Sequence, residues 1–452
     1  MKLALTRRRQ TVPSSLPRFL PLACALTLVL TGQARADVVT DWNAVVTGPL
    51  VAPRFGGPQQ QFRALAMVQI AVHDALNSID RRYETYDVVP TANAGANPDA
   101  AVAAAARRVV FAMLAPLPQS PEKAAAFAAV QDAFRATLGP TPYSNNKLQG
   151  IAAGQAAAGA ILARRHNDGS ATPSTPYLLL PGPGVYQPTP NPEFPDVVVP
   201  AFGLWGQVTP FAIRDAEQFR PGPAEILELG PAYAREYNEV KRVGDALVRG
   251  IHPNSERSDI ARYWPGGGSN TNLTARTLVT GRNLDRWQHA QLFALMNIAA
   301  ADGLITTMGA KYHYNFWRPV TAIRWAHDGN PDTVPDFSWR PFLTTPPYPD
   351  YPCALPTVVG ASIGVLRDYF GTDAIAFDQT FDAPILPLPA PLEPLPVKTI
   401  TRHFNSLSAA THEAINARVY AGIHFRSGCI AGAKSATRVA HFVTANYLKP
   451  VR

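Results

Sequence analysis

The sequence is short of cysteines, long apolar runs and alternating apolar and polar residues. Its 452 residues include only 3 cysteines, which excludes a disulfide-dense scaffold. Beyond the first 36 residues no apolar run reaches the ~18 residues of a membrane-spanning helix. Because period-two alternation is scarce, a β-rich fold is not expected. The 46% hydrophobic share is normal for a globular protein and excludes wholesale disorder.

Two features are in excess, namely proline, with 44 residues, and a formal net charge of +8. The charge is concentrated at the start of the chain. Residues 1–36 contain six basic side chains and no acidic one, so they supply six of the eight net charges. The remainder is nearly neutral, and the sequence does not predict a nucleic-acid partner.

Residues 1–36 have the pattern of an export signal. A basic segment, Lys2 to Arg18, precedes an apolar stretch, Phe19 to Leu30, and a small-x-small cleavage site ends at Ala36. The apolar stretch is too short to span a bilayer about 30 Å thick, so an N-terminal anchor is the weaker interpretation. We therefore expect an exported, periplasmic or extracellular protein with no stable membrane span after signal removal.

We predict a mainly α-helical fold, a helical-bundle core with long proline-rich loops, in a single domain over residues 37–452. Two proline-rich stretches, 172–210 and 383–396, are predicted to pack as loops over the helices, because dense proline excludes helix and central strand. The predicted helices are 100–117, 120–139, 145–166, 283–308, 357–370 and 401–422.

The most informative polar residues lie between 311 and 424. Lys311 and Arg318 follow a predicted buried helix, and their point charge and planar fork together suit a tetrahedral oxyanion. The proline-rich turn 345–356 leads into a helix whose first backbone N–H groups can bind an anion. Arg418 and His424 stand at the end of the last predicted helix. Surface charges and a structural histidine are the alternative interpretation.

These segments resemble a three-part signature, Lys-x6-Arg-Pro, Pro-Ser-Gly-His and Ser-Arg-x3-Gly-x-His. It is shared by vanadium-dependent haloperoxidases, class A acid phosphatases and type 2 phosphatidic acid phosphatases. The resemblance is strongest over residues 283–443, towards the secreted bacterial haloperoxidase-like branch. The matching residues are Lys311, Arg318, Pro319, Pro352, Arg418, Gly422 and His424.

The resemblance implies an oxyanion pocket for phosphate or vanadate. Lys311, Arg318 and Arg418 would hold the oxygens, and the backbone at Cys353 and Ala354 would add N–H donors. His424 would be the ligand of vanadate in a haloperoxidase, or the nucleophile in a phosphatase. The implied substrates are small molecules, either a phosphate ester or peroxide plus halide, and the residues leave both activities open.

Two positions depart from the signature. Leu355 stands where the family has the histidine that acts as general acid or base, and Ala417 replaces a serine. Because general acid–base catalysis is worth ~10²–10⁴-fold in rate, we expect reduced activity unless another group substitutes. The candidate substitutes are His313, His327 and Asp350.

Cysteine use suggests one covalent link at the same place. Cys24 lies inside the predicted signal, whereas Cys353 and Cys429 flank the proposed pocket and meet an oxidising compartment after export. A disulfide between them is therefore a candidate, worth roughly 4 kcal/mol in the chain-entropy model. Two separate buried thiols are the alternative.

Three other functions compete with this interpretation. Gly-x-Ser-x-Gly around Ser362 fits a serine-hydrolase elbow, with Asp373 or Asp382 and His403 or His424 completing a triad, but the chain lacks alternating β and α elements. His73-Asp74 and His327-Asp328 give a weak signal for a metal-dependent hydrolase. The third is a degenerate, non-catalytic family member that binds an oxyanion or a partner, which Leu355 favours.

Overall fold

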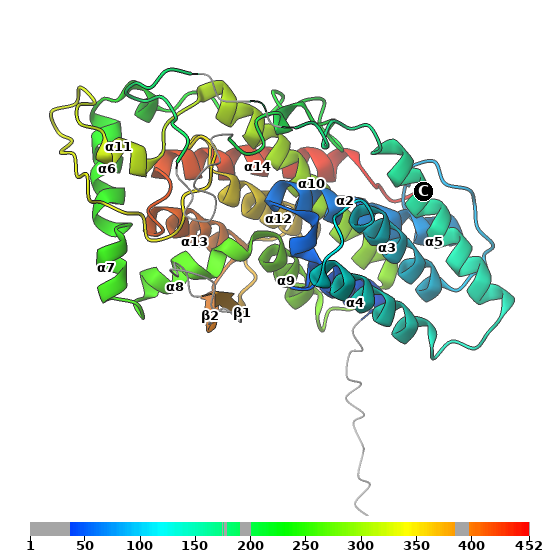
Figure 1. Cartoon of the computed structure of the whole chain (residues 1–452). Helices are drawn as coiled ribbons and strands as arrows, with labels where there is room; N and C mark the ends of the chain where they lie inside the picture. Colours follow the sequence, from blue (N-terminus) through cyan, green and yellow to red (C-terminus); the bar gives the residue numbers. More distant parts are fainter. Residues whose placement is uncertain (1–36, 174, 176–178, 190–199, 385–396, 452) are drawn as a thin grey trace, which may run out of the picture. The chain divides into compact units, whose positions relative to one another are not determined.

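The computed structural model describes residues 37–173, 175, 179–189, 200–384 and 397–451. The predicted export signal and nearly all of the 383–396 stretch lie outside the described residues, as do parts of the 172–210 stretch. Helices account for most of the described chain, which confirms the mainly α-helical prediction (Figure 1).

The helices in the first half of the described chain are α1 Val38–Thr47, α2 Pro58–Ile79, α3 Pro98–Leu114, α4 Pro121–Leu138, α5 Asn145–Arg164, α6 Pro231–Val243 and α7 Ala246–Ile251. Those in the second half are α8 Glu256–Tyr263, α9 Gly267–Val279, α10 Arg286–Tyr314, α11 Pro319–Arg324, α12 Ala354–Phe370, α13 Leu407–Tyr420 and α14 Arg426–Asn446. A single antiparallel hairpin joins β1 Phe377–Pro384 to β2 Val397–Phe404.

Local chemistry explains where the predicted helices begin. Ser120 caps α4 by accepting a hydrogen bond from the Lys123 N–H, with Pro121 at the first helical position. The helix α12 starts three residues before the predicted 357, because Pro356 is tolerated in a first turn. The helix α10 continues past the predicted 308 and ends where Asn315 adopts a left-handed φ of 51°. Lys311 therefore lies in the last turn of α10 rather than after it.

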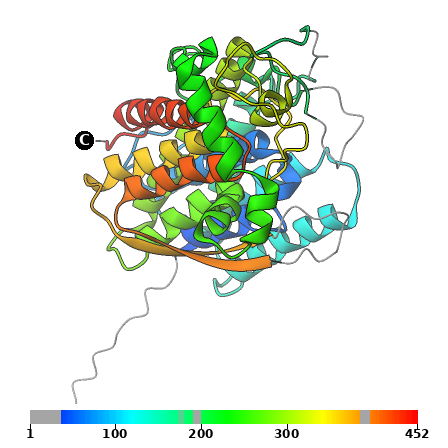
Figure 2. The same cartoon turned by 90° about the vertical axis from the view of Figure 1, so that its left-hand side faces the viewer.

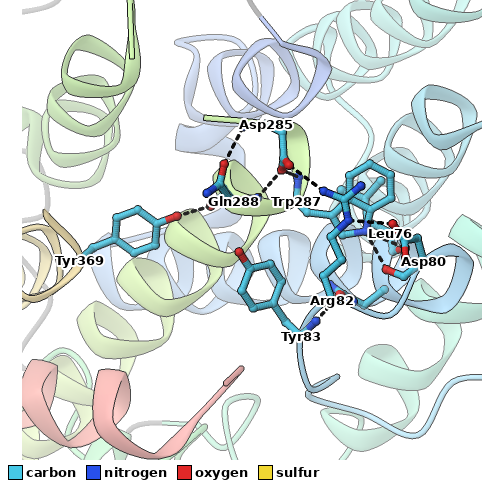
Figure 3. Close-up of polar contacts among 9 residues, drawn as sticks. Leu76, Asp80, Arg82, Tyr83, Asp285, Trp287, Gln288 and Tyr369 are labelled. Atoms are coloured by element: carbon cyan, nitrogen blue, oxygen red, sulfur yellow. Dashed lines mark hydrogen bonds and ion pairs between the residues drawn. The ribbon is translucent and has the colours of Figure 1, made fainter. Parts of the chain in front are cut away.

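The start of the central helix α10 is tied to two other helices (Figure 3). Asp285 and Gln288 form a capping box, and Arg82 bonds the Asp285 carboxylate. The Trp287 indole N–H donates to the last carbonyls of α2, and the Arg82 guanidinium lies 4.2 Å above the Trp287 ring. Tyr369, near the end of α12, donates to the Gln288 carbonyl. These contacts fix the direction of the α10 axis and therefore the position of its C-terminal end.

One predicted helix is partly wrong. Residues 401–404 were expected to begin a helix running to 422, but they belong to strand β2, and α13 starts only at Leu407. The segment from Val397 to Phe404 is rich in β-branched residues, pairs with β1 and buries one side chain in four. The hairpin packs on α8, α9 and α13 and is seen from a second side in Figure 2.

The helices form two groups that share α10. On one side α2, α3 and α5 pack together, and on the other α12 packs against α13 and α14, while α10 contacts both α2 and α12 (Figure 1). Small residues bring α12 and α14 close, because a methyl group at Gly364 would meet the Ala440 side chain at 2.6 Å. The helix α10 is long and apolar enough to cross a membrane, but 94% of its most apolar window is buried in the protein.

Candidate functional site

The predicted site residues come from the ends of different elements. Lys311 lies in the last turn of α10, Arg318 caps α11, and Arg418 lies in the last turn of α13. His424 stands in the short connection between α13 and α14. We call Lys311, Arg318 and Arg418 the cation cluster. All three are buried, with Arg418 the most accessible at 8% exposure.

A cluster of buried aromatic side chains holds these ends in place. Two of its members are next to site residues in the sequence: Trp317 precedes Arg318, and Phe425 follows His424. The ring of Tyr233, from α6, lies 6.1 Å from that of Trp317 and 5.8 Å from that of Phe425. Because such rings pack in few orientations, the cluster limits how the neighbouring polar side chains are directed.

Backbone carbonyls orient two of the cations. Lys311 Nζ donates to the carbonyls of Pro349 and Asp350 at 2.7 and 2.8 Å. Arg318 Nε donates to the Tyr348 carbonyl at 2.7 Å, and its Nη1 donates to the carbonyl of Ile423 at 2.8 Å. The proline-rich turn thus presents carbonyls to the cations, a role that the sequence analysis did not foresee.

The tautomer of His424 follows from its neighbours. Arg318 Nη1 lies 2.8 Å from His424 Nε2, and a guanidinium can only donate, so Nε2 carries a lone pair. Burial, reinforced by the Arg318 and Lys311 charges, holds the pKa of His424 well below its usual value. The imidazole is therefore neutral, with its proton on Nδ1 and its Nε2 available as a ligand or nucleophile.

Asp350 is the acidic side chain closest to this histidine. Its Oδ1 lies 2.8 Å from His424 Nδ1 and 3.9 Å from Arg318 Nη1, and the side chain is fully buried. The contact with His424 lacks hydrogen-bond geometry, and neither carboxylate oxygen has a hydrogen-bond partner among the described residues. Burial raises the pKa of Asp350 to about 8, against the pull of Arg318 and Lys311. At neutral pH this carboxyl group is protonated and can give up a proton.

Two donors of the cation cluster have no partner within the described part of the chain. They are Arg318 Nη2 and Arg418 Nε, both buried. Burial and the neighbouring Arg318 charge also lower the pKa of Lys311 to about 7. Unpaired buried cations are costly, and an oxyanion among them would supply both charge and acceptors. The residues present therefore fit a phosphate- or vanadate-like group.

The start of α12 contributes less than expected. Cys353 caps the helix, but its N–H already donates to the Gly428 carbonyl at 2.9 Å. Of the two predicted backbone donors, the Ala354 N–H is the one in the first turn, where N–H groups have no carbonyl partner inside the helix. Cys353 and Cys429 are free thiols packed in one buried cluster, so their disulfide stays a prediction.

The structure separates the three candidate substitutes for the missing histidine. His313 and His327 are exposed, and the His313 ring faces Arg220 at 3.4 Å. Asp350 alone of the three lies against Arg318 and His424. Leu355 itself is half-buried and packs on the main apolar core. The spacing of the sequence did not reveal which candidate was close.

The serine-hydrolase interpretation is wrong. Ser362 lies in the middle of α12, is 1% exposed and follows helix rather than a strand. The proposed partners are engaged elsewhere, since His403 pairs with Asp378 and Asp373 bonds Ser408.

The two His-Asp pairs do not form metal centres. His73 Nε2 contacts the Glu84 carbonyl, and Asp328 accepts from Thr333. Within the described ranges no group of three His, Cys, Asp or Glu side chains could hold a metal ion. These pairs tie loops to helices.

Comparisons with known proteins find chains similar to this one. A family model described as the VCPO second helical-bundle domain matches residues 291–452. The vanadium chloroperoxidase of Curvularia inaequalis is 26% identical over 84% of this chain and 75% of its own length. These two matches support the vanadium haloperoxidase superfamily, and the family model does so over residues 291–452.

Two solved structures share the fold of this chain. A bacterial vanadium-dependent iodoperoxidase superimposes with a TM-score of 0.71 at 22% identity, over 92% of this chain and 96% of its own. A holo-type bacterial vanadium-dependent chloroperoxidase gives 0.69 at 18% identity, over 91% and 98%.

One further site residue, Tyr348, was not predicted from the sequence. Lys311 Nζ and the Arg318 guanidinium lie 5.0 and 4.9 Å from the centre of its ring. An aromatic face in this position stabilises buried cations without occupying their donors. The only signal in the sequence was its place in the proline-rich turn.

Proposed function

We propose that this protein is a vanadium-dependent haloperoxidase, which oxidises a halide with peroxide at the site around His424. The observation that carries the proposal is the neutral His424, whose Nε2 lone pair faces a buried guanidinium that still has unpaired donors. Superfamily relatives named for chloroperoxidase and iodoperoxidase activity support it.

The residues would divide the work as follows. His424 Nε2 would be the ligand of vanadate, and the cation cluster with the Ala354 N–H would hold its oxygens. When bound, vanadate would supply the Lewis-acid centre that activates peroxide towards a halide. The cation cluster would neutralise the oxyanion in a site from which water is excluded by burial.

Asp350 would take the proton-transfer role that Leu355 cannot perform. It is the titratable group that touches both Arg318 and His424, and its pKa near 8 allows it to hold a proton at neutral pH and to release one. This matches the requirement that a general acid or base have a pKa near the working pH.

One alternative has an observation in its favour. In the structure Arg318 Nη1 donates to the His424 nitrogen that a ligand would need, and Leu355 removes the usual acid or base. A non-catalytic protein that binds an oxyanion would tolerate both features. Acid phosphatase activity would use the same residues, with His424 as nucleophile.

The experiment compares three readouts on one preparation. Vanadate binding is measured by calorimetry, bromination of an organic acceptor is measured with peroxide and bromide, and hydrolysis is measured on p-nitrophenyl phosphate. Bromination that requires vanadate supports the proposal. Vanadate binding without turnover identifies the non-catalytic alternative, and vanadate-inhibited hydrolysis identifies a phosphatase.

We also propose that the protein is exported, on the basis of the pattern in residues 1–36. Expression of the full chain in a bacterial host and sequencing of the N-terminus of the periplasmic product tests this. A product that begins at Asp37 is expected, whereas an intact N-terminus in the cytoplasm would refute export.

A further inference from the structure

Two buried thiols lie where the helices α12 and α14 begin. Cys353 is the N-cap of α12, and Cys429 is in the first turn of α14. Both are fully buried and share one apolar cluster with Ile415 and Ala433. Neither is bridged.

The backbone brings the thiols together without a covalent bond. The Cys353 N–H donates to Gly428, the residue before Cys429, at 2.9 Å. The two helices also approach closely, since a methyl group at Gly432 would lie 2.4 Å from the Cys353 carbonyl oxygen. The pairing is therefore a product of packing, and it persists when the thiols are reduced.

The surroundings make the two thiols unequal. Burial works against ionisation of Cys353, but the Cys429 thiol and the cation cluster together lower the pKa of Cys353 to about 6. Burial and the neighbouring Cys353 raise the pKa of Cys429 well above its usual value. Cys353 is also the N-cap of α12, where the helix dipole favours a thiolate. Because the thiolate is the nucleophile, Cys353 is the attacking sulfur and Cys429 is held in reserve.

A cavity outside the oxyanion site lies next to the same pair. It has a volume of about 540 Å³ and lies between α12, α13 and α14. Ile415 and Ala433 line it, and these same two side chains pack on the cysteines. One layer of side chains thus separates the thiols from a space that small molecules can enter.

We propose that Cys353 and Cys429 form a peroxide-reactive dithiol, in which Cys429 protects Cys353 from irreversible oxidation. The inference rests on the proposed function in one respect, because peroxide is the oxidant that a haloperoxidase receives. The dithiol chemistry itself requires no vanadate and no halide.

The reaction balances in two steps. The Cys353 thiolate attacks one peroxide oxygen, the O–O bond breaks, and the departing hydroxide takes a proton to become water, leaving a sulfenic acid. The Cys429 sulfur then attacks the Cys353 sulfur, an S–S bond forms, and a second water leaves. Peroxide gains two electrons, and the two thiols lose them. A thiol reductant reverses the bridge by exchange.

Peptide mapping by mass spectrometry tests the proposal on the vanadate-free protein, reduced and then treated with two molar equivalents of hydrogen peroxide, enough to take one thiol to sulfinic acid. In the wild type we expect a linked Cys353–Cys429 peptide pair that a thiol reductant separates. In Cys429→Ser we expect Cys353 to carry two added oxygen atoms, as sulfinic acid. In Cys353→Ser, the matched control, Cys429 should stay largely a free thiol. Peptide mapping also distinguishes these two cysteines from Cys24, the third cysteine of the chain.

Three results would overturn the proposal. They are sulfinic acid on wild-type Cys353 at this dose, two thiols that remain free, or a bridge that no reductant opens in the folded protein. If a variant does not fold, the result for the wild-type protein alone decides whether the proposal holds. Halide oxidation is measured in parallel with vanadate, so loss of that activity beside an intact dithiol reaction counts against the proposed function only.

Discussion

Two buried charge clusters in this molecule follow opposite rules. Near the N-terminal helices, the Asp168 carboxylate forms ion pairs with Arg63 Nε and Arg165 Nη2, each at 2.7 Å. It also accepts a hydrogen bond from the Ser170 N–H at 3.0 Å. In the candidate site Asp350 is also buried, yet neither of its oxygens has a hydrogen-bond partner in the described ranges.

The pKa values show what this difference means. Burial acts against ionisation at both positions. At Asp168 the hydrogen bond and charge of Arg63 outweigh the effect of burial, and the pKa of Asp168 falls below its usual value. At Asp350 burial wins, and the pKa rises to about 8. A buried carboxylate that is hydrogen-bonded to cations stabilises the fold. A buried carboxyl group without hydrogen-bond partners can instead exchange a proton with a ligand.

The largest effect should come from removing the proposed ligand. His424→Ala should lower the kcat/KM of vanadate-dependent bromination by ~10²–10⁴-fold, because it removes the imidazole Nε2 that we propose as the vanadate ligand. Steady-state kinetics measures this, with thermal melting as a check on folding. The control is His403→Ala, an exposed histidine on β2, which should be silent. Equal losses in both variants would separate the activity from this site.

The next effect tests the two clusters directly through stability. Asp168→Asn should lower the free energy of unfolding by about 3–5 kcal/mol, since it leaves two buried guanidinium groups without their anion. Asp350→Asn replaces a neutral acid that makes no hydrogen bond, so it should change that free energy by no more than about 1 kcal/mol. Urea unfolding at pH 7 gives both values. Similar losses would mean that Asp350 is also a structural ion.

Much of the fold could be predicted from sequence, because helix ends have local signals. Ser120 and Pro121 marked the start of α4, and the apolar run before Lys311 marked α10. The hairpin was missed because the prolines after Pro384 obscured two strands that pair across them. Ser406, which caps α13 by accepting the Ala409 N–H, was the available signal that the helix starts after the strand.

The site was predictable only in part. Local spacing drew attention to the cation cluster and His424, and the resemblance to the family signature implied their roles. Spacing could not choose Asp350 over His313, since the choice depends on how the proline-rich turn packs against the end of α10. Nor could it reveal that the turn's carbonyls orient Lys311 and Arg318. Those contacts depend on the folded path of residues 348–350.

A smaller effect should show whether Asp350 replaces the missing histidine. Asp350→Asn should lower bromination by ~10²-fold, the low end for general acid–base catalysis, and change the shape of the pH profile. Leu355→His should do little in the wild type but restore activity in the Asp350→Asn background. The four proteins are compared across a pH series. If Leu355→His instead accelerates the wild type as strongly as it rescues the variant, Asp350 is not the substitute.

The smallest effect concerns the pH dependence of anion binding. Lys311, with a pKa near 7, faces Arg318, Asp350 and Cys353, and an anion favours its protonated form. Above pH 7 binding must therefore take up a proton, and the affinity should fall by at most about tenfold per pH unit. Ionisation of Asp350 near pH 8 acts in the same direction. Calorimetry with sulfate, whose charge is constant over this range, measures the slope, and Lys311→Met should bind weakly with a shallower one. An affinity that rises with pH would show that Lys311 is not a partner of the anion. The cation cluster would then have a structural role, like the arginines that pair with Asp168.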